Sequence, residues 1–255
     1  FVAVSANLAF TVLEATYAYI ADSVSLLGDA GHNLGDVLGL LLAWGAAYLA
    51  GKKTSRMYSY GYRRTTILAA IINALVLVFA ASLIAFESLE KFIQPTPIQE
   101  IPVIVVASIG IVVNTGAAWL FIKGSKKDLN LKAAFLHLAY DALISVGVVV
   151  TATAILYTGW MWLDPLAAVM IVVIITWGAW GLLRDSVNLI LDAVPQGIDR
   201  TSVENYLHSI DGVTKIHDVH IWGMSTNENG LTAHLIMPDN SLWESETGYA
   251  EISRQ

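Results

Sequence analysis

Long apolar runs separated by short polar segments occupy the first three quarters of the chain. The apolar runs cover approximately residues 2–21, 28–50, 66–92, 99–122, 132–157 and 163–183. An α-helix needs roughly 20 predominantly apolar residues to cross the hydrocarbon core of a bilayer, and each run is about that long. The pattern therefore predicts an α-helical membrane protein with a bundle of six spans.

The composition supports a membrane protein and limits its chemistry. Hydrophobic residues make up 56 % of the 255 residues and charged residues only 14 %, whereas a soluble domain averages about 25 % charged residues. Continuous apolar runs exclude a membrane β-barrel, whose strands alternate apolar and polar positions. There is no cysteine, so any metal must be held by nitrogen and oxygen ligands.

The basic residues between the apolar runs predict the orientation. KKTSRMYSYGYRR at 52–64 and KGSKKDLNLK at 123–132 are rich in Lys and Arg, whereas ADSVSL, QPTPIQE and TGWMWLD contain neither. Because basic loops stay in the cytoplasm, both termini are predicted to be cytoplasmic. The first run carries Asn7 and Glu14 and has neither a basic flank nor a cleavage site, so it is not a signal peptide. Without a targeting peptide and with compact loops, a bacterial inner membrane is expected.

A different composition begins after Arg184. DAVPQGIDR is typical of a linker, TSVENYLHSI of a short helix, and VTKIHDVHIWGM and LTAHLIM of two strands joined by a turn at Asn229 and Gly230. WESETGYAEIS is expected to begin a second helix. We therefore expect residues 1–191 to form the transmembrane domain and residues 192–255 a small cytoplasmic α+β domain of ferredoxin-like type. This domain is expected to be incomplete, within a chain that starts at Phe1 as part of a longer one.

Two of the apolar runs contain the same pair of ionisable residues. His32 and Asp36 are four residues apart in the second run, and His137 and Asp141 are four apart in the fifth. Residues at this spacing project from one face of a helix. Because spans alternate in direction, the second and fifth helices run antiparallel. If their polar faces meet, His32 should lie level with Asp141 and Asp36 level with His137. Two nitrogens and two oxygens would then converge tetrahedrally, which is a geometry and ligand set that Zn²⁺ favours.

Structural roles compete with this metal-site interpretation. A single polar pair in a span often makes only a helix-packing hydrogen bond. A carboxylate near the middle of a bilayer costs roughly 2.5 to 3.5 kcal/mol on insertion scales, and such residues usually face a cavity, an ion path or a partner. Duplication of the pair favours a metal site, and a proton relay without metal is the principal alternative.

Other polar residues in or near the spans allow two interpretations each. Glu14, Asn73 and Asn114 either line the ion path and orient the ligands or form helix-packing hydrogen bonds. Asp22 and Asp29 are expected near the outer mouth, where they either attract cations or cap a helix.

The C-terminal segment contains further histidines. His217 and His220 are three residues apart in one predicted strand, which would place them on opposite faces of the sheet. His234 in the next strand can reach either of them, depending on the register. His208, in the predicted helix, is expected to be a surface residue.

With six spans and two HxxxD pairs in order, the chain resembles the cation diffusion facilitator family, in particular its zinc transporter branch. SVSLLGDAGHNLGDVLGLLLA resembles the family's second span, LNLKAAFLHLAYDALISVGVV its fifth, and TKIHDVHIWGMS the first strand of its cytoplasmic domain. The resemblance implies a homodimeric antiporter that moves Zn²⁺ out of the cytoplasm in exchange for H⁺. It assigns the transport site to His32, Asp36, His137 and Asp141, and a regulatory zinc site to His217 and His234.

The resemblance also bears on metal preference. A histidine at the position of His32 goes with Zn²⁺ over Cd²⁺ in this family, and Co²⁺ shares the tetrahedral geometry. The chain departs from the family in two ways: 123–132 contains no histidine, and 52–64 lacks the Asp and His of a loop zinc site. The basic residues of 52–64 are instead expected to meet anionic lipids or carboxylates at a dimer interface.

Three other classes of function compete with transport. An intramembrane zinc hydrolase needs an open coordination position and a motif such as HExxH, which the sequence lacks. A membrane metal sensor has no need for two HxxxD pairs inside the bilayer. A passive divalent cation channel is the nearest alternative, but four converging ligands would bind the cation too tightly for rapid release. The composition gives no support for a nucleic-acid partner.

Overall fold

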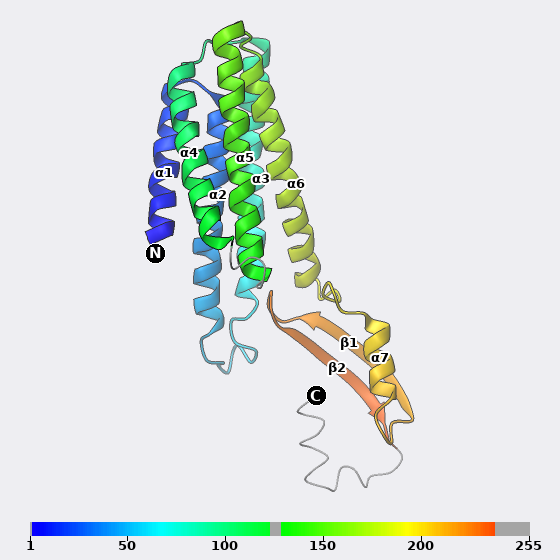
Figure 1. Ribbon diagram of the computed structural model, residues 1–255. Helices are drawn as coiled ribbons and strands as arrows, with labels where there is room; N and C mark the ends of the chain where they lie inside the picture. Colours follow the sequence, from blue (N-terminus) through cyan, green and yellow to red (C-terminus); the bar gives the residue numbers. More distant parts are fainter. Residues whose placement is uncertain (1, 123–128, 238–255) are drawn as a thin grey trace. The chain divides into compact units, whose positions relative to one another are not determined.

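The computed structural model describes residues 2–122 and 129–237, which form seven helices and two strands (Figure 1). The first six helices, in chain order, are α1 (Val2–Ile20), α2 (Val24–Ala50), α3 (Thr65–Ile93), α4 (Glu100–Phe121), α5 (Leu129–Thr158) and α6 (Leu163–Ile190). They are followed by α7 (Arg200–His208), β1 (Lys215–Gly223) and β2 (Asn229–Ile236). The predicted second helix at 243–253 lies outside the described residues, as does most of 123–132.

Five of the helices, α2 to α6, are long and apolar enough to cross a membrane. Their mean hydropathy over the most apolar window ranges from 1.3 to 2.7. This confirms an α-helical membrane protein with five of the six predicted spans. The remaining predicted span corresponds to α1, a helix of 19 residues, and its role as a span stays a prediction.

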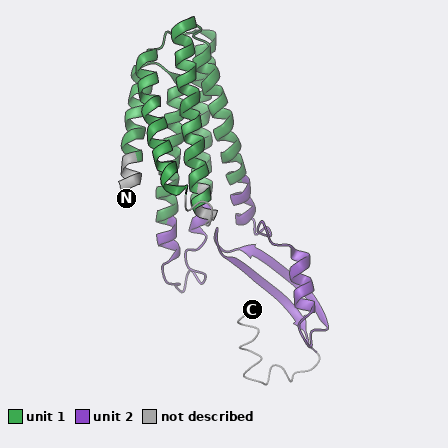
Figure 2. Ribbon diagram, viewed as in Figure 1, with its two compact units in different colours: residues 1–45, 69–183 green, residues 46–68, 184–255 purple. Residues whose placement is uncertain are grey.

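The chain divides into two compact units (Figure 2). The first contains residues 1–45 and 69–183 and consists of packed long helices. The second contains residues 46–68 and 184–255, and its described part includes α7 and the two strands.

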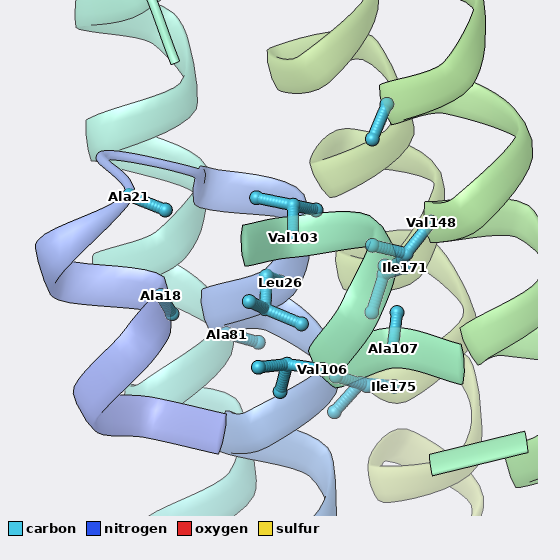
Figure 3. Close-up of a cluster of buried hydrophobic side chains, with 11 residues drawn as sticks. Ala18, Ala21, Leu26, Ala81, Val103, Val106, Ala107, Val148, Ile171 and Ile175 are labelled. Carbon is cyan, nitrogen blue, oxygen red and sulfur yellow. The ribbon is translucent and has the colours of Figure 1, made fainter. Parts of the chain in front are cut away.

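Small and branched apolar side chains from all six long helices and the α1–α2 connection fill the centre of the first unit (Figure 3). Alanines allow close approach between helices, where van der Waals packing supplies much of the association in lipid. The buried cluster comprises Ala18, Ala21, Leu26, Ala81, Val103, Val106, Ala107, Val148, Ala152, Ile171 and Ile175. This packing fixes the helices that carry the polar residues.

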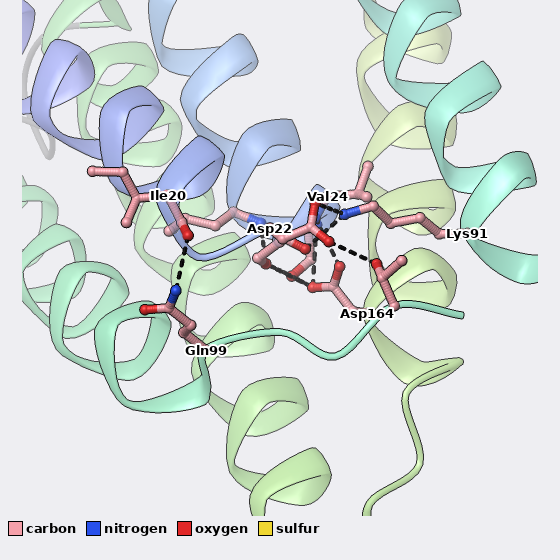
Figure 4. Close-up of polar contacts among 10 residues, drawn as sticks. Ile20, Asp22, Val24, Lys91, Gln99 and Asp164 are labelled. Atoms are coloured by element: carbon pink, nitrogen blue, oxygen red, sulfur yellow. Dashed lines mark hydrogen bonds and ion pairs between the residues drawn. The ribbon is translucent and has the colours of Figure 1, made fainter. Parts of the chain in front are cut away.

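The start of α2 is held by a residue from a distant part of the chain (Figure 4). Asp164 of α6 accepts hydrogen bonds from the backbone N–H groups of Val24 at 2.7 Å and Ser25 at 3.3 Å. Its carboxylate also accepts from the hydroxyls of Ser23 and Ser25. These contacts satisfy the free N–H groups of the first turn, so α2 begins at Val24, four residues before the apolar run that predicted it.

Asp22 has a different role next to this cap. Its backbone has a φ of 54°, and its carboxylate accepts hydrogen bonds from Lys91 at 2.5 Å and Thr96 at 2.7 Å. Lys91 also donates to the Asp22 carbonyl at 2.7 Å (Figure 4). Asp22 therefore links the α1–α2 connection to the end of α3, and the expectation that it caps a helix is wrong.

In the second unit, α7 precedes a two-stranded antiparallel sheet. Asp199 caps α7 by accepting from the N–H groups of Thr201 and Ser202. The hydrogen bond from the Ser202 hydroxyl, together with these two from the backbone, holds the pKa of Asp199 below its ordinary value. The helix and antiparallel strands bear out a small C-terminal domain. A complete ferredoxin-like fold stays a prediction, because the described residues provide two strands.

The turn between the strands lies earlier than predicted. Met224 and Ser225 donate backbone hydrogen bonds to the Glu228 carbonyl, and the Ser225 hydroxyl accepts from the N–H groups of Asn227 and Glu228. Asn229 and Gly230 instead belong to β2. At Gly230, a Cβ atom would lie 2.6 Å from the Trp222 ring, so this glycine serves a close cross-strand contact rather than a turn.

The basic connection 52–64 pairs with carboxylates of its own chain within the second unit. Arg63 contacts Glu228 at 2.7 Å, and Arg64 contacts Asp192 at 2.6 Å. Arg63 and Arg64 thus have carboxylate partners in their own chain, and the expectation that the basic residues meet lipid or a second subunit stays a prediction. Their partners are more than a hundred residues away in sequence, and no local pattern indicates such pairs.

Candidate metal-transport site

The two HxxxD pairs project from α2 and α5 toward one another inside the first unit. Leu26 of α2 and Val148 and Ala152 of α5 belong to the same buried apolar cluster, which holds both helices in one packed unit. His32 Nε2 lies 3.4 Å from Asp141 Oδ1, and His137 Nε2 lies 3.4 Å from Asp36 Oδ2. Histidine of one helix thus lies level with aspartate of the other, as an antiparallel arrangement requires.

Contacts within each helix complete the cluster. His32 Nδ1 lies 3.9 Å from Asp36 Oδ2, and His137 Nε2 lies 3.7 Å from Asp141 Oδ2. Ligand atoms about 2.0–2.1 Å from a tetrahedral zinc ion are roughly 3.3 Å from one another. The spacings across the helices are close to that value, so small side-chain movements suffice to surround an ion.

The four side chains differ in how tightly they are gathered. His32, Asp36 and Asp141 offer ligand atoms that all lie within 4.8 Å of one another. The ring centroid of His137 lies 6.1 Å from that of His32, and its side chain is 48 % exposed, compared with 4 % for Asp141. Three potential ligands are therefore clustered, and His137 lies at the edge of this group.

Two atoms of this cluster are buried without hydrogen-bond partners, namely His32 Nδ1 and Asp141 Oδ1. An unpaired polar atom in a low-dielectric interior costs about 1–3 kcal/mol. A cation bound among these side chains would give such atoms partners. The donor set therefore fits a divalent ion of the zinc type.

A cavity of about 530 Å³ adjoins the cluster. Apart from the four ionisable residues and Thr151, its walls are mostly apolar and come mainly from α5 and α6. Residues along those two helices that line it include Ile144, Gly147, Val148, Met170, Ile171 and Ile174. The four residues thus border an open space in the first unit.

The remaining polar residues of the spans are mostly held by packing contacts. Asn33 donates from Nδ2 to Glu14 Oε2 at 2.9 Å, and Ser145 donates to Asp29 Oδ2 at 2.7 Å. Asp29 is buried inside α2 and caps no helix. Asn73 lies against Gly39. A Cβ atom on Gly39 would be 2.9 Å from the side-chain nitrogen Nδ2 of Asn73. Asn114 is buried, and its Nδ2 has no hydrogen-bond partner.

The second unit gathers histidines on one face of its sheet. His217 pairs directly with His234, and their ring centroids are 5.2 Å apart. His220 pairs with Thr232, two residues from His234 on β2, so His217 and His220 share a face. The prediction of opposite faces is wrong because a β-bulge between them adds one residue to β1.

Asp218 forms the bulge, and spacing alone did not single it out. Its φ of 58° is a left-handed conformation, and its carboxylate lies 2.9 Å from His220 Nε2 and 3.7 Å from His234 Nδ1. The hydrogen bond and charge of His220 hold the pKa of Asp218 below its ordinary value. Among the residues with described positions, however, only the membrane cluster brings three ligand atoms within 4.8 Å. His208 is exposed on α7, as predicted.

Family comparisons account for both parts of the chain. Residues 1–191 match the cation efflux transmembrane domain, and residues 195–255 match the cation efflux protein cytoplasmic domain. The chain therefore belongs to the cation efflux family, which confirms the resemblance to cation diffusion facilitators. This is a family of transporters rather than a class of enzymes.

Similar proteins are transporters from bacteria. A cadmium, cobalt and zinc/H(+)-K(+) antiporter of Bacillus subtilis is 32 % identical over 249 residues, which cover 96 % of this chain and 80 % of the relative. The zinc transporter ZitB of Escherichia coli is 34 % identical over 228 residues, which cover 89 % of this chain and 72 % of the relative. The metal cation efflux system protein CzcD of Cupriavidus metallidurans is 34 % identical over 227 residues, with the same coverage.

Proposed function

We propose that this protein exports Zn²⁺ from the cytoplasm in exchange for protons by alternating access, with His32, Asp36, His137 and Asp141 as the transport site. The observation that carries the proposal is the cross-pairing of the two HxxxD pairs at 3.4 Å inside a helical membrane unit. Relatives named as zinc transporters and as a zinc antiporter support the same cargo.

The chemistry of the four ligands supports exchange. Histidine must be neutral to bind a metal, so arrival of the ion displaces a proton and arrival of a proton weakens the metal site. Facing the cytoplasm, the site binds Zn²⁺ and releases H⁺. Facing outward, where protons are more abundant, His32 and His137 take up H⁺ and Zn²⁺ leaves. One site thereby couples both ions.

The ligand set favours Zn²⁺ but also suits related ions. Two imidazole nitrogens and two carboxylate oxygens form a compact tetrahedral set, to which the larger and softer Cd²⁺ is less suited. Co²⁺ shares the geometry. The names of the Bacillus subtilis and Cupriavidus metallidurans relatives include cadmium and cobalt, or metal cations generally, so both ions belong in any transport assay.

A passive channel is the less favoured alternative. Ions cross a channel quickly only when they are held weakly, whereas ligand atoms within 4.8 Å of one another bind a cation tightly. Release of a tightly bound cation requires protonation of the ligands or a conformational change. The antiporter name of the Bacillus subtilis relative favours exchange as well.

The proposal includes a topology and an assembly. Six spans, with α1 as the first, put both termini in the cytoplasm, and a bacterial inner membrane is the proposed location. Residues 1–191 form the transmembrane domain and residues 192–255 a cytoplasmic domain that supports a homodimer. Within that domain His217 and His234, whose rings are 5.2 Å apart, are the proposed ligands of a regulatory Zn²⁺.

Flux in sealed proteoliposomes tests the transport proposal directly. Vesicles containing a pH dye and a zinc dye are exposed to Zn²⁺, and the intact protein is compared with His32→Ala and Asp141→Ala. Zn²⁺ movement with opposite proton movement, abolished in both variants, is expected. Asp211→Asn, at an exposed position in the second unit, provides the control. Unchanged flux in both site variants would make the four residues structural contacts, and flux without proton movement would indicate a channel.

A further inference from the structure

Two carboxyl groups outside the four-ligand cluster are fully buried next to each other. Glu14 of α1 and Asp29 of α2 are both 0 % exposed. The Glu14 carboxyl contacts Asn33, which lies one helical turn after Asp29 on α2, so both carboxyls lie along the same face of that helix. Neither residue belongs to the set that binds the cargo in the proposed function.

Each carboxyl has a partner for one oxygen only. Asn33 donates to Glu14 Oε2 at 2.9 Å, and Ser145 donates to Asp29 Oδ2 at 2.7 Å. The second oxygens, Glu14 Oε1 and Asp29 Oδ1, are buried and have no hydrogen-bond partner. Each carboxyl thus has one buried acceptor oxygen that lacks a donor.

The surroundings do not neutralise two negative charges. Two other ionisable groups interact with the pair. Asp141 of α5 repels a negative charge on either carboxyl, and His32 of α2, when protonated, attracts a negative charge on Asp29. Two ionised carboxylates side by side in a dry interior are strongly disfavoured. A single proton between the two unpaired oxygens supplies the missing donor and removes one charge.

A metal ion fits this position less well than a proton. Hard cations such as Ca²⁺ take about six to eight oxygen ligands. The two carboxyls offer four oxygens at most, and two of these already accept hydrogen bonds from Asn33 and Ser145. Two carboxyl groups that each lack one donor match the requirement of a single proton.

We propose that Glu14 and Asp29 hold one proton between them and form a proton-binding site separate from the four residues that bind the cargo. The proposal deepens the proposed function, on which its coupling step rests. Asp29 lies three residues before His32 on α2, so a dication at His32 repels the shared proton and stabilises the ionised pair. Departure of the dication restores the proton.

Infrared spectroscopy of the metal-free full chain tests the proton without requiring transport. A protonated carboxyl has a carbonyl stretch distinct from that of a carboxylate. We expect this band in the wild-type protein at neutral pH, shifted in D₂O, and lost in Glu14→Gln. The amide that this substitution introduces can donate to Asp29 and so replaces the proton without leaving a gap. Glu90→Gln, at an exposed position of α3, is the matched control and should retain the band.

The wild-type spectrum alone can overturn the proposal, whether or not the variants fold. Absence of the protonated band at neutral pH would contradict it. A band abolished by K⁺ in place of Na⁺ would indicate a bound cation and would also contradict it. A band that persists in both Glu14→Gln and Asp29→Asn would assign the proton to other residues.

Calorimetry of Zn²⁺ binding in buffers of different ionisation enthalpy tests the coupling. Wild-type protein should release protons as Zn²⁺ binds, and Glu14→Gln should bind Zn²⁺ while releasing about one proton fewer per site. An unchanged proton count would contradict the coupling, and loss of all Zn²⁺ binding in Glu14→Gln would make Glu14 part of the metal site. Failure of the wild-type protein to bind Zn²⁺ would count against the proposed function, while the infrared result stands on its own.

Discussion

The imidazole of His32 on α2 faces the carboxylate of Asp141 on α5, with 3.4 Å between Nε2 and Oδ1. Both side chains are largely buried, and each has one polar atom without a hydrogen-bond partner. Asp141 also lies 3.7 Å from His137 on its own helix. Asp141 therefore lies near both histidines, as Asp36 does, but its side chain is only 4 % exposed compared with 20 % for Asp36, so its removal should strongly affect the cluster.

Replacing Asp141 with Asn should abolish transport while leaving the helices folded. Asn keeps the shape but removes the charge that a divalent cation requires. Losing even an outer partner of a ligand typically costs about 10–100-fold in metal affinity, so a direct ligand should cost at least roughly 100-fold. Calorimetric Zn²⁺ titration of the purified protein measures this loss. Asp211→Asn should bind as the wild type does, and wild-type affinity in Asp141→Asn would remove Asp141 from the site.

Replacing His32 with Asp should broaden the choice of metal toward Cd²⁺. The change exchanges a nitrogen ligand for a harder, more flexible oxygen ligand, which relaxes the compact tetrahedron and admits a larger ion. Competition between Zn²⁺ and Cd²⁺ uptake in the same vesicles measures the shift. We expect the ratio of Cd²⁺ to Zn²⁺ transport to rise about tenfold, which corresponds to roughly 1.4 kcal/mol. A fixed ratio would show that position 32 does not set the preference.

The capping contact between Asp164 and the start of α2 should be important for stability. Asp164→Ala leaves the N–H groups of Val24 and Ser25 and the Ser23 hydroxyl without their acceptor in a buried place. A loss of about 2–3 kcal/mol is expected, because hydrogen bonds to a charged group and a helix cap disappear together. Thermal unfolding in detergent should show a lower midpoint for Asp164→Ala than for Asp164→Asn, which keeps one acceptor oxygen. Equal midpoints for the wild type and Asp164→Ala would contradict the capping role.

The Asp22–Lys91 contact should give stability that depends on pH. Burial alone would raise the pKa of Asp22, but hydrogen bonds from Lys91 and Thr96 and the charge of Lys91 hold that pKa below the ordinary value of 3.8. A lowered pKa in the folded state adds stability above about pH 4, and this is lost as the pH falls through the lowered pKa.

Asp22→Asn provides the comparison, because Asn also tolerates the φ of 54° at this position. The contact is half-exposed, so the difference from the wild type should be at most about 1 kcal/mol at pH 7. The difference in unfolding midpoint between the two proteins should be largest at pH 7 and should shrink as the pH falls below about 4. A difference that stays constant as the pH falls would have another cause.

The sheet of the second unit should bind a metal through His217 and His234. In protein whose membrane site carries Asp141→Asn, residual Zn²⁺ binding should disappear when His217→Ala is added. His208→Ala, on the exposed surface of α7, serves as the matched histidine control and should leave binding unchanged. Residual binding that survives His217→Ala would exclude His217 as a ligand.

Features that repeat along the chain were predicted well from sequence. The apolar runs predicted the long helices because lipid requires each helix to satisfy its own backbone hydrogen bonds over a fixed length. The HxxxD spacing and the alternation of helix direction predicted that His32 would lie level with Asp141. These features depend on local geometry, which the sequence specifies directly.

Features that depend on distant partners could not be predicted in this way. The first turn of α2 is stabilised by Asp164, which is 140 residues away from Val24 in sequence. The β-bulge at Asp218 changes which face His220 occupies, and an alternating pattern gives no sign of an added residue. Arg63 and Arg64 likewise pair with Glu228 and Asp192, whose positions only the folded chain reveals.

The cross-pairing of the two HxxxD pairs has a consequence for directionality. Half a rotation about an axis perpendicular to the helices exchanges His32 with His137 and Asp36 with Asp141, and both cross-helix distances are 3.4 Å. An ion at the centre of this pseudo-twofold arrangement meets the same donor types from either side. The four side chains alone therefore do not set the direction of transport. Direction must come from neighbours that break the symmetry: Asp141 is 4 % exposed but Asp36 is 20 %, and the buried carboxyls of Glu14 and Asp29 belong to α1 and α2.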